Sequence, residues 1–439
     1  MAHRGKPLTS SAHTVLWFQM ATGVSSLGGR VTEIALPLTA LLVLDCSALQ
    51  VGILSSATLL PNLILGIPAG TWVEGMHPRR LMLLCDAGRA IAIGSIPVAQ
   101  AFGLLAFPHL LASALVVGAL TVFGDIASAS YLPRLVGLEA LVSARSRQMT
   151  LMQLADVAGR PLGGLLVGAF GAARAMAADT LSYVVSLAFV WRLPEMPPTR
   201  APGEGEPFGE RLRAGARFAW RNQVNRRIAL EAAHYNLFYQ ALIVVFLVLA
   251  SSRLGWSGTQ IGLALGANSL GAVIGSALAP RLSTRWGIGP VILRALLFAD
   301  GVTLLIPVVL GSGGISVALM CLIFLIIGAG SLISGVLASS LNRLVTPEEI
   351  YSRVIGANRV LTRGGTALGG LLGGLLVEYF DPRPALVICA VGMCSAAAWV
   401  ASRRITSVHT VADALIDSPL TPPSAPASPS AAAERTGSA

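Results

Sequence analysis

The sequence has little charge for its length. Lysine, arginine, aspartate and glutamate make up 12% of the 439 residues, about half the share of an ordinary soluble domain. Hydrophobic residues reach 54%, and the mean hydropathy is +0.72. A soluble surface needs far more polar cover, and a disordered chain is poor in apolar residues. The composition therefore excludes both and predicts a polytopic membrane protein.

Cysteine and histidine are also scarce. The five cysteines form no CxxC pair, and the six histidines form no HExxH motif or paired spacing. The sequence also lacks a Gly-x-Ser-x-Gly elbow and a GxxxxGK[ST] phosphate loop. We therefore expect no enzyme activity, no metal site, no cofactor and no ATP hydrolysis by this chain. The cysteines are interpreted as small apolar residues.

Apolar stretches of about 20 residues, long enough to cross a bilayer, follow one another along the chain. Twelve spans are predicted, at 15–43, 49–73, 80–105, 109–132, 147–171, 175–193, 229–251, 259–282, 289–311, 315–340, 354–379 and 384–401. The predicted fold is thus an all-α membrane protein with twelve transmembrane helices.

The segments outside these spans differ in composition. A short tail (1–13) precedes them, a linker (194–228) divides them, and a tail rich in Ser, Ala and Pro (402–439) follows and is expected to be disordered. Within the linker, the basic and apolar residues of Arg211–Arg221 are typical of an amphipathic helix on the membrane surface, or of a solvated connector helix.

The arginines are unevenly distributed among the predicted loops. Of the 31 basic residues, Arg174, Arg253 and Arg383 lie in loops on one side, six lie inside spans, and the other 22 lie in the termini, the linker and the opposite loops. Because cytoplasmic loops carry an excess of Lys and Arg, both termini are predicted to be cytoplasmic. The net charge of +10 is then a topology signal, so we expect a lipid bilayer and no nucleic acid as partner.

The two halves of the chain repeat short patterns. Gln50-Val-Gly52 matches Gln260-Ile-Gly262, and the pattern LGGLL occurs at both 162–166 and 368–372. The segments 96–98 and 306–308, and 134–143 and 343–352, match at nearly the same offset of about 210 residues. We therefore expect two parallel six-helix bundles, 14–193 and 229–401, an architecture of transporters that rock about a midplane site.

The connection between the second and third spans carries a recognisable motif. Gly70-Thr-Trp-Val-Glu74-Gly-Met-His77-Pro-Arg79-Arg80 resembles the Gly-x-x-x-Asp-Arg-x-Gly-Arg-Arg loop of the major facilitator superfamily, with a longer acid at Glu74, Gly75 in place of the basic residue and His77 in place of the glycine. The third span then begins Asp86-Ala-Gly-Arg89. The resemblance implies a gating loop that contains Gly70, Glu74, Arg79, Arg80, Asp86 and Arg89.

The fourth and fifth spans are similar to those of bacterial drug exporters of the macrolide and enterobactin exporter type. The fourth ends Phe123-Gly-Asp125-Ile-Ala-Ser-Ala-Ser-Tyr131-Leu-Pro133. The fifth contains Gly159-Arg160-Pro161-Leu-Gly163-Gly164, where drug antiporters have Gly-Pro-x-x-Gly-Gly, so the glycines match and the proline is displaced by one residue.

The resemblance covers about residues 14–404 and implies a function. It implies export of a small amphipathic compound, such as a drug, an antibiotic or a siderophore, by proton antiport across the cell membrane of a bacterium, with the monomer as the functional unit. Uptake or uniport of a metabolite is the alternative within transport. A non-transporting membrane protein or a lipid-modifying enzyme is the alternative of another class.

Charged residues inside spans are costly unless paired or hydrated, so each is a functional candidate. Arg30 and Glu33 lie three residues apart in the first span, and Asp156 and Arg160 lie four apart in the fifth. Both spacings place the two residues on one helix face. Each pair is predicted to be either a self-neutralised packing element or part of a substrate or proton site.

Asp125 in the fourth span has no partner one turn away. A buried acid of this kind can exchange a proton, and the alternative is an ion pair with Arg89 or with the basic residues of the gating loop. The candidates for proton coupling are therefore Asp125, Glu33 and Asp156. Asp86 with Arg89, Asp179, and Arg294 with Asp300 are predicted to hold the bundles or their gates together.

Arg359 and Arg363 share one face of the eleventh span without a local acid. They are predicted either to bind an anionic group of the substrate or to pair with acids of the other half. We expect the substrate cavity between spans 1, 4 and 5 and spans 7, 10 and 11. Its candidate residues are Arg30, Arg160, Arg359, Arg363, Phe18, Gln19, His234, Asn236, Phe238 and Asn268; the aromatic ones also fit an interfacial belt.

Overall fold

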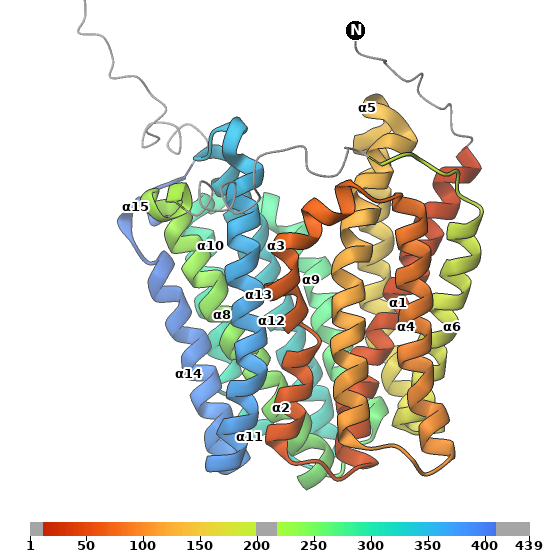
Figure 1. Ribbon diagram of the computed structural model, residues 1–439. Coiled ribbons are helices and arrows are strands. Elements are labelled where there is room, and N and C mark those ends of the chain that lie inside the picture. Colours follow the sequence, from red (N-terminus) through yellow and green to blue (C-terminus); the bar gives the residue numbers. More distant parts are fainter. Residues whose placement is uncertain (1–11, 199–216, 410–439) are drawn as a thin grey trace, which may run out of the picture.

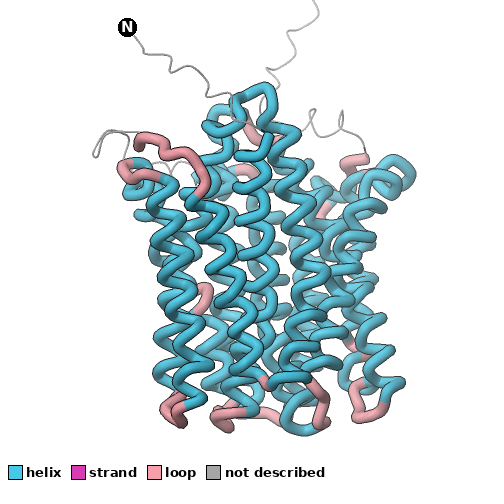
Figure 2. Tube along the Cα trace, turned by 90° about the vertical axis from the view of Figure 1, so that its right-hand side faces the viewer, coloured by secondary structure: helices cyan, strands magenta, loops and turns pink. Residues whose placement is uncertain are grey.

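The computed structural model describes residues 12–198 and 217–409, and every regular element in these ranges is a helix. The helices run side by side along one axis of the molecule (Figures 1 and 2). The first half contains α1 (Ala12–Leu42), α2 (Ala48–Ala57), α3 (Leu60–Glu74), α4 (Pro78–Ala101), α5 (Phe107–Phe170) and α6 (Ala172–Trp191). The second half contains α8 (Gln223–Val248), a π-helical turn (Leu249–Arg253), α9 (Gly258–Trp286), α10 (Ile288–Thr303), α11 (Ile306–Val309), α12 (Gly314–Leu344), α13 (Glu348–Tyr379), α14 (Pro382–Val400) and α15 (Arg403–Thr406).

Four of the predicted spans differ from single helices. The second predicted span is divided into α2 and α3, with Pro61 in the first turn of α3, and the ninth is divided into α10 and α11, with Pro307 in the first turn of α11. The fourth and fifth spans lie together in α5, as two helices that meet at a kink where the backbone of Gly137 is not helical. Gly137 has φ +72°, a conformation that only glycine adopts without strain.

Within the described ranges, ten helical segments are long and apolar enough to cross a membrane. The two predicted spans outside that set are α1 and the second half of α5, and these two carry Arg30, Glu33, Asp156 and Arg160. Both nevertheless pack lengthwise within the first bundle (Figure 1). Their charges therefore lower the hydropathy of the segments without removing them from the bundle.

The internal repeat is present in the local geometry as well as in the sequence. α2 and α9 both begin with a capping box, Ser47 with Gln50 and Ser257 with Gln260. In each box the serine N–H donates to the glutamine Oε1 over 2.8 Å, and the glutamine N–H donates to the serine Oγ over 3.3 Å. Two helices at equivalent places thus start in the same way, as expected for two parallel bundles.

The two ends of the molecule are distinct. We call the end at which α6 ends and α8 begins the linker end, and the opposite end, with the connections 43–47, 102–106 and 254–257, the loop end (Figure 1). At the linker end Arg80 pairs with Glu195, and the Tyr131 hydroxyl donates to the Pro194 carbonyl over 2.8 Å. In the predicted amphipathic helix, residues 217–221 are helical, and residues 211–216 lie outside the described ranges.

The bundles touch each other through glycines toward the loop end, a contact that we call the glycine seam. α2 meets α13 where Gly52 faces Gly370 and Gly374, and α5 meets α9 where Gly164 faces Gly258 and Gly262. A Cβ atom on Gly52 would lie 2.5 Å from the Gly370 carbonyl oxygen, and one on Gly164 would lie 2.5 Å from that of Gly258. Only glycine permits this approach of backbones, so the repeated glycines close the loop end.

Candidate functional site

A cavity of about 850 Å³ lies between the bundles in the linker half of the molecule. Its wall is formed by α3 and the first half of α5 on one side and by α8, α10, α12 and α13 on the other. The expected walls on spans 4, 7, 10 and 11 are present, whereas spans 1 and 5 contribute no lining residue. The charged lining residues are Asp125, Glu231, Arg359 and Arg363, and the amide-bearing ones are Asn62, Asn236, Asn342 and Asn358.

Arg359 and Arg363 present two cationic groups from α13. They lie one turn apart, both side chains are exposed to the cavity, and neither forms an ion pair within the described part of the chain. Asp125, on α5 of the other bundle, is exposed in the same cavity and interacts electrostatically with both. The cavity therefore offers two guanidinium groups whose hydrogen-bond donors are available to a ligand.

Glu231 on α8 is a charged lining residue that the sequence analysis overlooked. Its side chain is buried and no described residue forms an ion pair or a hydrogen bond with it. Asp300, on α10, is buried nearby, and one of its carboxyl oxygens has no hydrogen-bond partner. The predicted partner of Asp300, Arg294, instead lies over the ring of Trp286, 5.8 Å from the ring centroid. An acid inside a predicted span was the signal that could have found Glu231.

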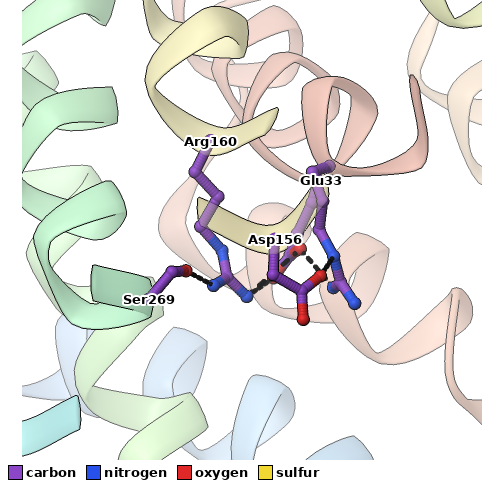
Figure 3. A network of polar contacts seen from close by, with 5 residues as sticks. Glu33, Asp156, Arg160 and Ser269 are labelled. Carbon is purple, nitrogen blue, oxygen red and sulfur yellow. Dashed lines mark hydrogen bonds and ion pairs between the residues drawn. The ribbon is translucent and has the colours of Figure 1, made fainter. Parts of the chain in front are cut away.

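The four charges of the first and fifth spans form one network (Figure 3). Arg30 pairs with Glu33 over 2.8 Å, as its spacing predicts, and also with Asp156 of α5 over 2.5 Å. Arg160 pairs with Glu33 of α1 over 3.1 Å and not with Asp156, so of the two alternatives for Asp156 and Arg160 the self-neutralised pair is wrong. The cross-pairing arises because the two helix faces meet and each arginine reaches the acid of the other helix.

This network also reaches the second bundle. Arg160 donates to the Ser269 hydroxyl on α9 over 2.5 Å (Figure 3). Glu33 and Arg160 border a second, smaller cavity of about 70 Å³, together with Tyr239 of α8. The tetrad of Arg30, Glu33, Asp156 and Arg160 is neutral overall, which lowers the cost of placing four charges inside the bundle.

Asp86, which is buried, and Arg89, which is partly buried, form an ion pair on α4. Their side chains are 2.7 Å apart, Asp86 also accepts a hydrogen bond from Ser186 of α6, and Arg89 lies over the ring of Tyr183. Asp179 on α6 accepts a hydrogen bond from Thr32 of α1 over 2.5 Å. These contacts join α4, α6 and α1 within one bundle, so Asp86 is held by its own bundle and not by the other.

The gating loop is described only in part. The guanidinium of Arg79 donates to the backbone carbonyls of Val190 and Trp191, and Arg80 pairs with Glu195. These contacts therefore connect the loop to the end of α6 and to the start of the linker. The side chain of Glu74 and the surroundings of Gly70 lie outside the described residues.

The glycine motif of the fifth span packs on two neighbours. Gly159 and Gly163 lie against α1, where a Cβ atom would meet Arg30 and Val31, respectively. Gly164 belongs to the glycine seam, and Pro161 packs against Gly266 of α9. The motif thus lies where α5 contacts both α1 of the same bundle and α9 of the opposite bundle.

The weaker candidates are scattered. Phe18 is buried and stacks on Tyr131, and Gln19 is buried and donates to the Ala144 carbonyl over 3.1 Å. Asn268 donates to the Phe324 carbonyl over 3.2 Å. None of these three lines either cavity.

The candidates on α8 divide between two faces. The ring of His234 lies 3.0 Å from both the Gly392 carbonyl and the Ser395 hydroxyl, so it faces α14. Phe238 packs against His234 and Gly392 on that face. Asn236 faces the large cavity.

Comparisons with known proteins agree with this architecture. Residues 4–425 match the family described as transmembrane secretion effectors. The enterobactin exporter EntS of Citrobacter koseri is 31% identical over 339 residues, 75% of this chain and 77% of that protein. EntS of Salmonella typhimurium is 30% identical over the same share of this chain and 78% of its own length.

Solved structures share the fold at low sequence identity. The nucleoside transporter NupG has a TM-score of 0.70 at 14% identity, over 88% of this chain and 98% of its own. A bacterial homologue of the iron transporter ferroportin, in an inward-facing state, has a TM-score of 0.70 at 16% identity, over 90% of this chain and 100% of its own. With the matching family covering nearly the whole sequence, the chain belongs to the transmembrane secretion effectors of the major facilitator superfamily, multi-pass membrane transporters and not enzymes.

Proposed function

We propose that this protein exports a small amphipathic compound with an acidic group, of the siderophore type, in exchange for protons. It works by alternating access as a monomer in the bacterial cell membrane, with both termini in the cytoplasm. The coarser part of this statement, a membrane transporter of small molecules, follows from the family. The acidic substrate, the direction and the proton coupling are the proposal.

The observation that carries the proposal is the pair of cavity arginines. Arg359 and Arg363 project from one face of α13 into a cavity of about 850 Å³ and form no ion pair with a described residue. Two cations on one wall cost free energy unless a ligand or water satisfies them. A carboxylate, or an ionised catechol of the kind found in siderophores, supplies oxygens that accept charge-assisted hydrogen bonds from guanidinium groups. The chemical character of this wall therefore favours an anionic substrate group.

The direction rests on the distribution of basic residues. The linker end holds most of the arginines, which makes it the cytoplasmic end under the positive-inside rule. The large cavity lies in that half, and the glycine seam closes the other. A substrate would then load from the cytoplasm in this state. The similarity to enterobactin exporters agrees with outward transport.

Asp125 is the acid that we propose to couple substrate and proton. It lines the cavity together with both arginines and interacts with them. The ionised carboxylate can accept a hydrogen bond from a donor group of the substrate, and its protonation weakens that contact, so proton and substrate compete for one group, as exchange requires. Glu33 and Asp156, the other candidates, are each bound to an arginine of the tetrad.

Transport into everted membrane vesicles tests the proposal. Radiolabelled iron-free enterobactin and the cationic amphiphile tetraphenylphosphonium serve as probes in vesicles with an acidic interior. We expect enterobactin to accumulate, a protonophore to abolish accumulation, and Asp125→Asn to remove its dependence on the gradient. We expect Arg359→Gln with Arg363→Gln to reduce uptake at least about tenfold, because each lost charge-assisted hydrogen bond is worth about 1.5–3 kcal/mol.

Two outcomes would refute parts of this proposal. Accumulation of tetraphenylphosphonium without enterobactin would contradict an anionic substrate. Exchange of the probe that ignores any imposed proton gradient would instead favour the uniport alternative. Immunoblots of the vesicle membranes confirm that each variant has inserted.

A further inference from the structure

The second bundle contains two buried acids on different helices. Glu231 of α8 is 6% exposed and Asp300 of α10 is 1% exposed, and their carboxyl groups interact electrostatically. At 1.5 Å per residue, Glu231 lies roughly 12 Å and Asp300 roughly 18 Å along helices that both begin at the linker end. Glu231 lines the large cavity, whereas Asp300 does not. The pair is therefore deep in the bundle but can be reached from the cavity through Glu231.

No cation neutralises this pair. Within residues 12–198 and 217–409, neither acid forms an ion pair, and the Oδ2 atom of Asp300 is buried without any hydrogen-bond partner. The buried acids of the first bundle differ in this respect, because Asp86 has Arg89 and Asp179 accepts two hydrogen bonds.

None of the described groups around the pair forms an ion pair with it. Tyr235 on α8 interacts with both acids, and Cys394 of α14 interacts with Asp300. Among the charged and titratable groups on the surrounding helices, Arg294 lies over Trp286 and His234 binds α14. Arg359 and Arg363 of α13 line the cavity and form no ion pair with either acid.

A proton is the ligand that best fits these surroundings. An ionised carboxylate buried without a cation costs several kcal/mol, and a second one beside it adds repulsion. One bound proton removes a charge and supplies an O–H donor for the orphaned oxygen. A metal ion would demand several more oxygen ligands, and no cluster of three His, Cys, Asp or Glu suited to a metal occurs in the described part of the chain.

We propose that Glu231 and Asp300 form a second proton-binding site of the transport cycle, separate from Asp125 and located in the other bundle. The role of this site in transport rests on the proposed proton antiport. The binding of a proton by the two acids does not. In the state described here the proton leaves one carboxylic acid through Glu231 to water in the cavity. The carboxylate that remains is uncompensated, so it favours a return to the protonated form once the site faces the other side.

Proton binding can be measured without any substrate. Purified protein in lipid is titrated while pH-difference infrared spectra record the C=O stretch of protonated carboxyl groups. We expect a titrating band that is lost or shifted in both Glu231→Gln and Asp300→Asn. The matched control is Glu378→Gln, which removes an exposed acid from α13. A band that is the same in wild type and in both variants would overturn the proposal.

Transport assays then test whether the proton site of Glu231 and Asp300 takes part in coupling, independently of whether it binds a proton. In the vesicle assay with enterobactin, we expect Glu231→Gln and Asp300→Asn to lose at least about tenfold of the gradient-driven rate while they keep exchange of the probe at equilibrium. Gradient-driven rates equal to wild type in both variants would overturn the role of the site in coupling. If the wild type itself shows no gradient-driven transport but the infrared band depends on the pair, proton antiport fails and the proton site stands.

Discussion

The close backbone contacts of the glycine seam predict how a substitution there shifts the equilibrium between the conformation with the loop end closed and the one with it open. A Cβ atom at Gly262 would lie 2.6 Å from the Gly164 Cα atom and 2.9 Å from the Arg160 carbonyl oxygen. Both neighbours are backbone atoms that no rotamer change can move. Since carbon atoms prefer separations of about 3.5–4 Å, α5 and α9 must move apart by roughly 1 Å to accept even one methyl group.

The cost of Gly262→Ala falls on one conformation only. Overpacking of this kind costs about 1–3 kcal/mol, and the cost applies while the bundles touch at the seam. In the proposed alternating-access cycle the seam separates when the loop end opens, and the methyl group then has room. Gly262→Ala should therefore shift the equilibrium toward the loop-open state by a factor of about 5–150.

Distances between spin labels at the loop end measure this shift. In a background without the five native cysteines, labels at Leu104 and Val308 report on the two bundles, since both side chains are largely exposed. We expect Gly262→Ala to add a population with a longer distance. Gly301→Ala is the matched control, because no atom lies within 4 Å of its added Cβ. A distance distribution for Gly262→Ala identical to that of the control would refute the reasoning.

Four further substitutions test other contacts through thermal unfolding of the purified protein. Glu33→Gln removes a partly solvated acid that bridges two arginines, and we expect a loss of about 1–2 kcal/mol after allowance for solvent screening; an unchanged midpoint would argue against the tetrad. Ser257→Ala and Ser47→Ala each remove a helix cap worth about 1 kcal/mol, and because the two caps have equal geometry, clearly different losses would contradict their equivalence. Asp86→Asn leaves a partly buried arginine uncompensated, and we expect about 3–5 kcal/mol, against no loss in Glu378→Gln.

Much of the fold was predictable because the bilayer imposes simple rules on the sequence. Long apolar stretches located the helices, and the repeated patterns gave the two parallel bundles that the family match supports. The capping residues Ser47 and Ser257 act locally, so the equivalence of their helix starts was already present in the sequence. The count of twelve spans stays a prediction for α1 and the second half of α5, which the apolar criterion does not include.

The cavity was less predictable, because its walls depend on how helices rotate against one another. Sequence spacing placed Asp156 and Arg160 on one face, yet each pairs across to α1, where an opposite charge is nearer. His234 was a candidate for the cavity, but its ring faces α14 instead. Glu231, an acid inside a predicted span, was not predicted as a site residue, although a charge at such a position is costly to bury.

The sequence by itself determined that this protein folds in a lipid bilayer, that it consists of two repeated halves and which residues are costly to bury. Hydropathy, repetition and charge are properties of the chain. Only the tertiary structure decided which charges are compensated. It joined Arg30, Glu33, Asp156 and Arg160 into a neutral tetrad, and it left Arg359 and Arg363 facing the cavity and Glu231 beside Asp300. Compensation requires atoms within about 4 Å, and distances between helices are fixed only when the bundles pack.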